Sequence, residues 1–275
     1  MAMENLKPGV TTELEIERVK ERRRKKEKDL VIREIPLSIF LNGREQSTLF
    51  CSPQKLDYLA VGFLYLAGLL RSKDDLIGLK VDAKKGLAFV RTKKTTAQIE
   101  KEATAPGEET GGQRNTNPGY GKKASFAHIL GLSPGLQIES SLQVKVEELY
   151  QLMAALLDAS SLFKATGGVH SAALARPDKI LFLNEDIGRH NAVDKIAGEC
   201  ILKNISLDDK ILLSSGRIST EIVVKGAKLG LPLIVSHSAP TSLSVELAAK
   251  IGMTLVGFVR GQRLNIYTWA ARVTL

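Results

Sequence analysis

The second half of the chain alternates apolar segments with amphipathic ones, and this alternation constrains the fold more than any other feature of the sequence. From residue 165 onward, runs of apolar residues are followed by stretches whose apolar residues recur at helical spacing. The expected strands cover residues 170–175, 180–184, 210–215, 232–238 and 254–260, and the expected helices cover residues 191–202, 218–230 and 242–252. Such alternation predicts an α/β fold in which helices cover both faces of a largely parallel sheet.

Polar segments that contain glycine or turn-forming residues follow four of the expected strands. They are EDIGRHN after residue 184, SSGRIST after residue 213, SHSAPTS after residue 235 and VRGQR after residue 258. Because ligands of open α/β sheets bind beyond the carboxyl ends of the strands, we expect these segments to meet at one edge of the sheet. They would bring together the basic residues Arg189, His190, Arg217, His237, Arg260 and Arg263, with hydroxyl groups from Ser214, Ser215, Ser219, Ser238 and Thr241.

This set of side chains suits an anion. Guanidinium groups form bidentate hydrogen bonds with phosphate, and the free N–H groups of helix N-termini point at such ligands. We therefore expect a phosphate-bearing ligand, with His190 as an anion contact or an acid–base group. The alternative is that each residue is an ordinary turn or cap residue. For His170, which follows two glycines, burial in the core and a position beside a ligand both stay open.

The first hundred residues predict a smaller α+β unit. Residues 35–43 are typical of a strand that enters a hairpin at Asn42-Gly43. Residues 51–70 predict a helix with Ser52 as its N-cap and Pro53 in its first turn. Residues 79–92 predict two short strands.

The middle of the chain has a different composition. Residues 101–125 are polar, rich in Gly and Thr, and not periodic, which predicts a long loop or lid, and a helix is expected around residues 145–158. The predicted organisation is a charged arm at 1–33, a small α+β domain at 34–100, a mobile loop at 101–126 and the α/β domain at 127–275.

The net charge of +9 is concentrated near the N-terminus. Residues 17–29 contain eight Lys or Arg and four Asp or Glu. Such a run could bind nucleic acid or an acidic partner. No aromatic residue is interleaved to stack on bases, so nucleic acid is disfavoured and a solvated, mixed-charge helix or frayed arm is expected instead.

The sequence also argues against several classes of protein. No apolar run approaches the roughly 18 residues that a membrane-spanning helix needs, and the N-terminus lacks the pattern of a secretory signal, so we expect a cytoplasmic location. The two cysteines, Cys51 and Cys200, are far apart and form no CxxC pair, which excludes a cysteine-rich metal site. We expect both to be buried, and we expect no bound metal.

Several motifs together resemble one known family. They are TGGVHSAAL, EDIGRHNAVDKIAG, SSGRIST, SAPTSLSVELA and GFVRGQRLNIYT, in collinear order, preceded by PLSIFLNG and CSPQKLDYLAVGFLYLAG. Over residues 34–268 the chain resembles the formate dehydrogenase accessory proteins of the FdhD/NarQ family. The resemblance implies a three-layer fold similar to cytidine deaminases, with a small N-terminal domain and a homodimeric assembly.

The resemblance also implies a function in the maturation of formate dehydrogenase. Members of the family are sulfur carriers with a sulfurtransferase-type activity. They take persulfide sulfur from a cysteine desulfurase and pass it to Mo-bis(molybdopterin guanine dinucleotide), which they bind as a client. The family's cofactor-binding segment corresponds to Phe258, Val259, Arg260, Gly261, Gln262 and Arg263. A guanine nucleotide-like ligand contains phosphates, which agrees with the anion site expected from the residues alone.

The expected loop departs from the family pattern. The family typically carries C-G-x-C-G-K there, and alignment through Gly121-Lys122 places Asn117 and Tyr120 at the two cysteine positions. Neither side chain can carry a persulfide, because only a thiolate attacks sulfane sulfur. Two functions therefore stay open, which are sulfur transfer as in the family and a cofactor-binding chaperone without sulfur transfer.

The implied fold also raises the possibility of a nucleotide deaminase. That chemistry needs H-x-E and P-C-x-x-C segments that hold a zinc-activated water. The segment His170-Ser171-Ala172 lacks the glutamate, and no P-C-x-x-C is present. The sequence therefore argues against a deaminase.

Overall fold

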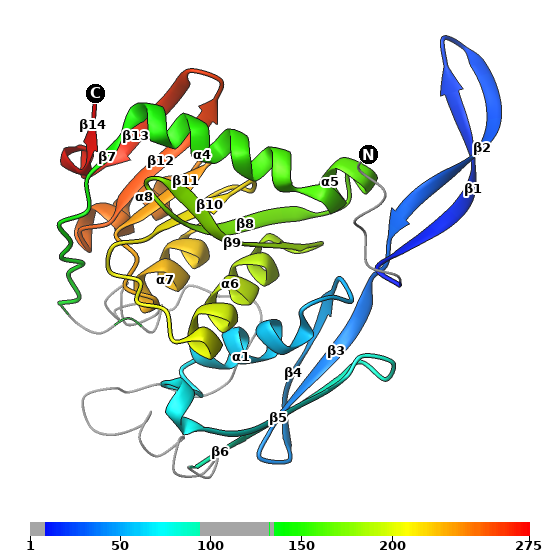
Figure 1. Cartoon of the computed structure of the whole chain (residues 1–275), viewed down its shortest axis with the longest axis horizontal. Helices are drawn as coiled ribbons and strands as arrows, with labels where there is room; N and C mark the ends of the chain where they lie inside the picture. Colours follow the sequence, from blue (N-terminus) through cyan, green and yellow to red (C-terminus); the bar gives the residue numbers. More distant parts are fainter. Residues whose placement is uncertain (1–8, 94–131, 133–134) are drawn as a thin grey trace.

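The larger part of the protein is built around a six-stranded sheet with the order β13-β12-β11-β10-β8-β9 (Figure 1). The computed structural model describes residues 9–93, 132 and 135–275. The strands of this sheet are β8 (His170–Arg176), β9 (Lys179–Asp186), β10 (Ile211–Ser214), β11 (Leu233–Ser236), β12 (Thr254–Arg260) and β13 (Arg263–Thr268). The five strands predicted in this region are confirmed, and β13 is an addition.

The sheet is mixed, so the prediction of a largely parallel sheet is wrong. Only β10 with β11 and β11 with β12 pair in parallel, whereas β8 pairs antiparallel with both of its neighbours and β13 pairs antiparallel with β12. Two residues join β8 to β9, and two join β12 to β13. A connection this short can only form an antiparallel hairpin. The strands β9, β10, β11 and β12 nevertheless all run in the same direction.

Helices cover both faces of this sheet, which confirms the three-layer α/β architecture. One face packs against α4 (Val146–Ala159), and the other packs against α6 (Arg189–Lys203), α7 (Thr220–Lys228) and α8 (Ser242–Lys250) (Figure 1). Neighbouring strand residues belong to different cores, since Ile211 and Leu213 join the cluster with α4 and Leu212 joins the other. Because both faces of each central strand are buried, these strands are continuously apolar.

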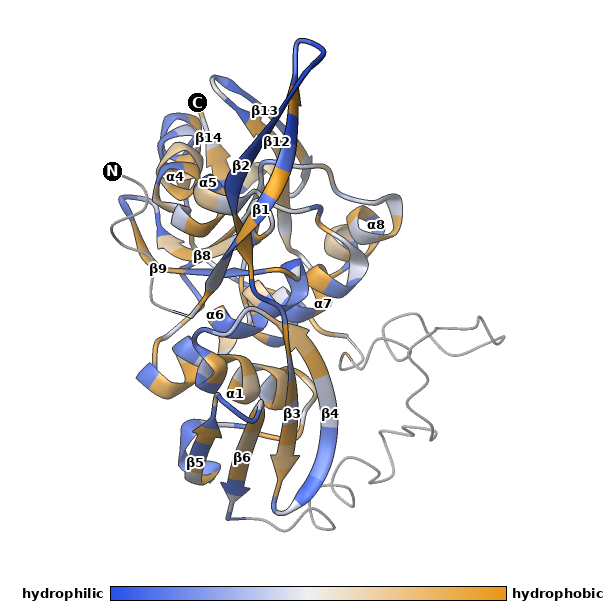
Figure 2. Cartoon of the chain, turned by 90° about the vertical axis from the view of Figure 1, so that its right-hand side faces the viewer, coloured by the Kyte–Doolittle hydropathy of each residue, from blue (hydrophilic) through white to orange (hydrophobic). Residues whose placement is uncertain are grey.

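The smaller domain is a four-stranded sheet with the order β4-β3-β6-β5 and a helix on one face (Figure 2). Its elements are β3 (Ile35–Leu41), β4 (Arg44–Cys51), α1 (Leu56–Leu66), β5 (Leu76–Asp82) and β6 (Leu87–Thr92). The predicted strands, the hairpin at Asn42-Gly43 and the helix are confirmed. Alternate residues of β3, Leu37, Ile39 and Leu41, are fully buried against α1.

The prediction that Ser52 caps this helix is wrong. The N-cap of α1 is Lys55, in the left-handed conformation, and it makes no side-chain capping bond. Ser52 is fully buried, and its backbone N–H and its hydroxyl both donate to Asp186 Oδ2, at 3.2 and 3.0 Å. A local capping motif has thus been replaced by a contact between the two domains.

The two domains meet where α1 crosses α6. A Cβ atom at Gly62 would lie 1.8 Å from the backbone oxygen of Asp194, and one at Gly198 would lie 1.9 Å from that of Tyr58. Real Cβ atoms do not approach backbone so closely, so each helix needs glycine at the crossing. This pair of glycines fixes the distance between the domains.

Residues 11–32 form a long hairpin that projects from the body of the molecule, shown in blue in Figure 1. Its strands are β1 (Thr11–Lys20) and β2 (Arg23–Ile32), so the expectation of a helix or a frayed arm is wrong. In the register of the two strands, Glu15 lies opposite Lys28 and Glu17 lies opposite Lys26, on one face of the hairpin. Opposite charges directly across two strands stabilise a hairpin, which explains why a charged segment forms strands.

The remaining described elements are short. They are η1 (Lys73–Asp75), β7 (Val144–Lys145), α5 (Ser161–Thr166), η2 (Ala270–Arg272) and β14 (Val273–Thr274). The predicted loop at 101–126, with Asn117 and Tyr120, lies outside the described residues. None of the helices in the described part of the chain is long and apolar enough to span a membrane.

Candidate functional site

The polar segments identified in the sequence meet at one edge of the six-stranded sheet. Because β9, β10, β11 and β12 share one direction, their carboxyl ends lie at the same edge, and the amino ends of the reversed strands β8 and β13 lie there too. We call this edge the rim and define it by the residues that the segments bring there: His170, Arg189, His190, Arg217, Ser219, His237, Ser238, Phe258, Arg260 and Arg263.

Close backbone packing joins the first three segments of the rim. A Cβ atom at Gly216 would lie 3.1 Å from Cβ of Arg189 and 3.4 Å from Nδ1 of His170. The backbone N–H of Ser171 donates to Ser215 Oγ at 2.9 Å, and the N–H of Ser215 donates to the carbonyl of Ser171 at 2.9 Å. Glycine at position 216 therefore leaves the space in which Arg189 and His170 lie side by side.

A second set of contacts joins the last three segments. Ser236 Oγ donates to the carbonyl of Gly216 at 2.6 Å and accepts from the N–H of Ser238 at 2.9 Å. The N–H of Phe258 donates to the carbonyl of Ser238 at 3.0 Å, and Arg260 Nε donates to the carbonyl of His237 at 3.2 Å. The loops after β10, β11 and β12 are thus one hydrogen-bonded unit.

Phe258 lies beneath the two arginines at the end of β12. The guanidinium carbon of Arg260 is 5.5 Å from the ring centroid of Phe258, and that of Arg263 is 6.0 Å away. Phe258 itself has φ +54°, a left-handed conformation that is unfavourable for an aromatic residue. This backbone places both guanidinium groups over one ring and leaves them exposed to solvent.

The other residues of the predicted cofactor-binding segment have different positions. Val259 is 1% exposed and packs in the core beneath α4, so only its backbone can reach a ligand. Gly261 and Gln262 form the exposed turn between β12 and β13. Gly261 has φ +58°, which glycine adopts without strain.

The histidines of the rim are held neutral at pH 7. Burial lowers the pKa of His190 to about 4, assisted by Lys225 and Arg189 and opposed by the carboxylate of Glu221, which lies 3.4 Å from Nε2. Burial, with Arg189 and Arg217, also lowers the pKa of His170, and burial with Arg260 lowers that of His237. The cationic groups of the rim are therefore its arginines.

Three buried polar atoms of the rim have no hydrogen-bond partner among the described residues. They are Arg189 Nε, His190 Nδ1 and Ser219 Oγ. A buried donor without a partner is costly, and such atoms in native proteins usually contact a ligand or water. Arg189 Nε and Ser219 Oγ can donate a hydrogen bond, as an anion requires, whereas the neutral His190 ring carries its N–H on Nε2, which faces Glu221, so that its Nδ1 is an acceptor.

Beneath the rim lies a buried ion pair that sequence reasoning missed. Lys195 on α6 and Asp186 at the end of β9 are completely buried, and Lys195 Nζ lies 2.6 Å from Asp186 Oδ2. Asp186 Oδ1 accepts from the N–H of Gly188 at 3.0 Å and from Asn191 Nδ2 at 2.9 Å. The pair thus fixes the segment that carries Arg189 and His190. Its only signal in the sequence is a lysine on the apolar face of the expected helix.

Both cysteines are buried. Cys51 and Cys200 are 0% and 1% exposed. Burial raises the pKa of each thiol to about 12, assisted by Asp186 for Cys51 and by Glu199 for Cys200. At pH 7 neither thiol is a nucleophile, because the thiolate fraction is negligible.

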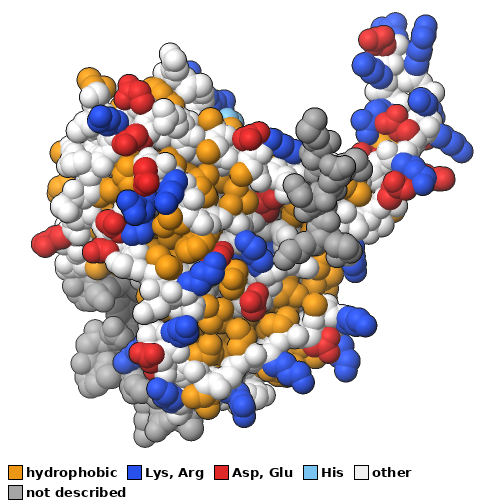
Figure 3. Space-filling model, viewed as in Figure 1, with side chains coloured by type: hydrophobic (Ala, Val, Ile, Leu, Met, Phe, Trp, Pro, Cys, Tyr) orange, Lys and Arg blue, Asp and Glu red, His pale blue; other side chains and the backbone are white. Residues whose placement is uncertain are grey.

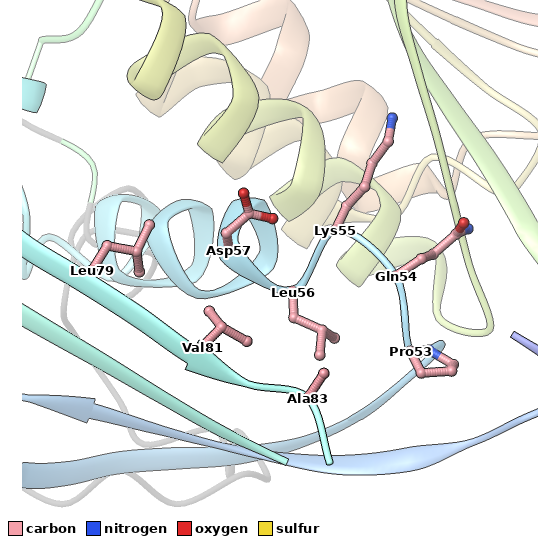
Figure 4. Close-up of a pocket in the computed structure, with 8 residues that line it drawn as sticks. All are labelled: Pro53, Gln54, Lys55, Leu56, Asp57, Leu79, Val81 and Ala83. Carbon is pink, nitrogen blue, oxygen red and sulfur yellow. The ribbon is translucent and has the colours of Figure 1, made fainter. Parts of the chain in front are cut away.

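A pocket in the smaller domain lies between the start of α1 and β5 (Figure 4). The polar side chains near its mouth are engaged elsewhere, since Lys55 Nζ donates to the carbonyl of Leu183 at 2.9 Å and Gln54 Nε2 donates to that of Glu185 at 3.3 Å. The pocket is lined by Pro53, Gln54, Lys55, Leu56, Asp57, Leu79, Val81 and Ala83. It offers aliphatic groups and the carboxylate of Asp57, and therefore does not suit an anion.

The fold and the rim define a class of protein, namely a three-layer α/β protein with an arginine-rich sheet edge and a smaller domain packed against it. A family model for the FdhD/NarQ family matches residues 32–274, and the chain belongs to this family. Similar proteins include "Sulfur carrier protein FdhD" of Geobacillus kaustophilus, 37% identical over 249 residues that cover 90% of this chain and 92% of the relative. The protein of the same name from Bacillus subtilis is 34% identical over 248 residues, with the same coverage of 90% and 92%.

A solved structure has the same fold. The crystal structure of a protein assigned as a formate dehydrogenase accessory protein from Desulfotalea psychrophila superposes with a TM-score of 0.76 at 25% identity. The superposition covers 96% of this chain and 100% of the other. The family membership expected from the motifs is therefore confirmed.

Proposed function

We propose that this chain is an accessory protein for formate dehydrogenase maturation that binds the guanine dinucleotide form of the molybdenum cofactor at the rim. The observation that carries the proposal is the convergence of Arg189, Arg217, Arg260 and Arg263 at one sheet edge, next to two buried donors, Arg189 Nε and Ser219 Oγ, that have no partner among the described residues. The names of the similar proteins supply the biological context. The relatives are named as sulfur carriers, and the similar solved structure is that of a protein assigned as a formate dehydrogenase accessory protein.

The donor set fits the phosphate-rich part of such a cofactor. Arg189 Nε and Ser219 Oγ would hold phosphate oxygens, and the exposed guanidinium groups of Arg260 and Arg263 would contact a second anionic group. When bound, the cofactor supplies the molybdenum chemistry of the client enzyme. The residues of this chain bind and orient it. The proposal includes a homodimer. A cysteine desulfurase would be a further partner only if the chain relays sulfur.

We further propose that the chain binds the cofactor without relaying sulfur through a cysteine of its own. The sequence contains only Cys51 and Cys200, and both thiols are buried and protonated. A persulfide carrier must expose a thiolate to its donor. In the family, this chemistry belongs to the loop positions that Asn117 and Tyr120 occupy here.

Titration with GDP, which represents half of the cofactor's nucleotide portion, tests the binding site. The parent protein should bind GDP in calorimetry, and Arg260→Ala should weaken binding by about tenfold or more, as expected for loss of a charged hydrogen bond. Arg176→Ala is the matched control, because Arg176 pairs with Asp178 at the opposite end of β8. No binding by the parent, or equal binding by Arg260→Ala, would contradict the proposal.

Incubation with a cysteine desulfurase and ³⁵S-cysteine tests the absence of sulfur relay. The parent protein should acquire no label that a thiol reductant removes. Reducible label on Cys51 or Cys200 would restore the sulfur-carrier function, and Cys51→Ser and Cys200→Ser would identify the carrier.

A further inference from the structure

The base of the β1–β2 hairpin is anchored beside the rim. Val10 and Ile32 pack with Leu162, Val169 and Ile187 in a small apolar cluster. Val169 directly precedes His170, and Ile187 lies two residues before Arg189. Arg33 adds hydrogen bonds to the carbonyls of Gly9 and Val10, at 2.7 and 2.9 Å. The arm is therefore held at one end, next to the candidate site, while the rest projects into solvent (Figure 3).

The charges in the middle of the arm neutralise one another. Lys28 Nζ lies 2.6 Å from Glu13 and Arg24 lies 3.1 Å from Glu17, while Arg18 pairs with both Glu27 and Asp29. These pairs account for the ribbon's stability as a hairpin. They leave little net charge in this part of the arm.

The tip is different, because most of its basic side chains form no ion pair among the described residues. Residues 20–26 contain six Lys or Arg and one Glu, a net charge of +5. Within the described chain no carboxylate lies within 4.0 Å of five of these cations, all exposed: Lys20, Arg22, Arg23, Lys25 and Lys26. Figure 3 shows the blue side chains at the far end of the arm, well separated from the body.

The turn at the tip has residues that a hairpin turn disfavours. Glu21 and Arg22 have φ of 50° and 63°, the left-handed conformations of a type I′ turn. Asn-Gly is the usual choice for such a turn, and a residue with a long side chain is strained there. The tip therefore keeps charge where folding alone would favour glycine. A departure from local preference of this kind is typical of a functional segment.

We propose that the β1–β2 hairpin is a docking arm whose tip binds an acidic protein surface. Two observations favour a protein over nucleic acid. Residues 11–32 include six carboxylates and no aromatic side chain, so the carboxylates interrupt any cationic track for a phosphate backbone and no side chain can stack on bases. The exposed Val19 and Leu14 offer aliphatic contacts between the charges, as protein interfaces do.

The identity of the partner rests on the proposed function. A protein that delivers a cofactor bound at its rim must also contact the apoprotein that receives it. The base of the arm packs against Val169 and Ile187, which precede His170 and Arg189 of the rim by one and two residues. The occupant is accordingly an acidic patch on the apo-oxidoreductase. The FdhD/NarQ family model matches residues 32–274, so most of the arm lies before the matched region.

Binding of the full-length protein to the apo-formate dehydrogenase of the same organism tests this arm. The test variant is Arg22→Glu/Arg23→Glu/Lys25→Glu/Lys26→Glu. The matched control is Lys73→Glu/Lys84→Glu/Lys85→Glu/Lys179→Glu, which changes the net charge by the same amount. Its four lysines are exposed and lie in η1, in the turn between β5 and β6, and at the start of β9. Each protein is also titrated with GDP, and with an arbitrary 20-base-pair DNA duplex and a 20-nucleotide RNA.

The expected result is a loss of affinity for the apoenzyme of about tenfold or more in the tip variant only, shrinking as salt is raised, with GDP affinity unchanged. Apoenzyme binding equal to the parent, or no binding by the parent, overturns the arm proposal even if GDP binds. Loss of DNA or RNA binding alone also overturns it, in favour of a nucleic-acid arm. Failure of the parent to bind GDP overturns the proposed function, whatever the arm does.

Discussion

The ammonium nitrogen of Lys195 lies 2.6 Å from Asp186 Oδ2, and both side chains are fully excluded from solvent. Lys195 Nζ also donates to Ser52 Oγ at 3.0 Å and to the carbonyl of Glu185 at 3.2 Å. The pair therefore connects the smaller domain, through Ser52, to the segment that carries Arg189 and His190. One buried charge pair holds the base of the rim and the domain interface together.

Removing one member of this pair should be strongly destabilising. Lys195→Met leaves the Asp186 carboxylate buried without its cation, and we expect a loss of about 3–5 kcal/mol in the free energy of unfolding, measured with urea. Lys164→Met breaks an exposed pair with Asp158 and should leave stability close to that of the parent. Equal effects of the two substitutions would contradict the structural importance of the buried pair.

The crossing of α1 and α6 should tolerate no side chain at its glycines. Gly62→Ala places a methyl group on the backbone of Asp194, which cannot move without shifting α6, and we expect a loss of about 1–3 kcal/mol or more. Gly78→Ala is the control, because its new methyl group would meet only the flexible side chain of Arg91, at 3.1 Å. Urea unfolding of both variants distinguishes a rigid crossing from an adaptable one.

Stability should fall in acid because of His190. Burial lowers the pKa of its imidazole to about 4, below the unfolded value near 6.5, so the unfolded chain binds this proton more tightly. The stabilisation is present above pH 6.5 and is lost as the pH falls toward 4. Between pH 7.5 and 5 we expect about 1–2 kcal/mol from this residue, allowing for partial solvation of the ring.

The variant His190→Gln should therefore have a flatter dependence of unfolding free energy on pH over this range. His237→Gln is the comparison, since that ring is less deeply buried, and it should keep most of the parent's dependence. A parent-like slope in His190→Gln would mean that the imidazole is already protonated near pH 6.

Neither cysteine should react in the folded protein. Burial raises the pKa of both thiols to about 12, so iodoacetamide at pH 7.5 should leave Cys51 and Cys200 unmodified over hours, and both should be alkylated in urea. Intact-mass spectrometry reports the number of adducts. Rapid alkylation of either residue without denaturant would show that the thiol opens to solvent, and would reopen a sulfur relay through it.

The position of the candidate site was largely predictable, because it depends on the direction in which the strands run and not on which strands are hydrogen-bonded to each other. Residues that follow strands of common direction share an edge whichever strands lie between them, so Arg189, Arg217 and Arg260 were placed correctly although the sheet is mixed. The core position of Val259 was missed, since motif similarity does not distinguish a backbone contact from a side-chain contact.

The sequence alone determined the elements of the α/β layers, the small domain's strands and the loss of the family's loop cysteines. These follow from local periodicity and residue identity. Tertiary structure decided the antiparallel pairings of β8 and β13, the role of Ser52 and the burial of Lys195. It also decided that residues 11–32 form strands, because cross-strand ion pairs, invisible to helical or strand periodicity, stabilise a segment with few apolar residues. The role of Ser52, the burial of Lys195 and the pairing of β8 with β10 depend on contacts between residues distant in the chain, whereas the hairpins depend on pairing across short turns.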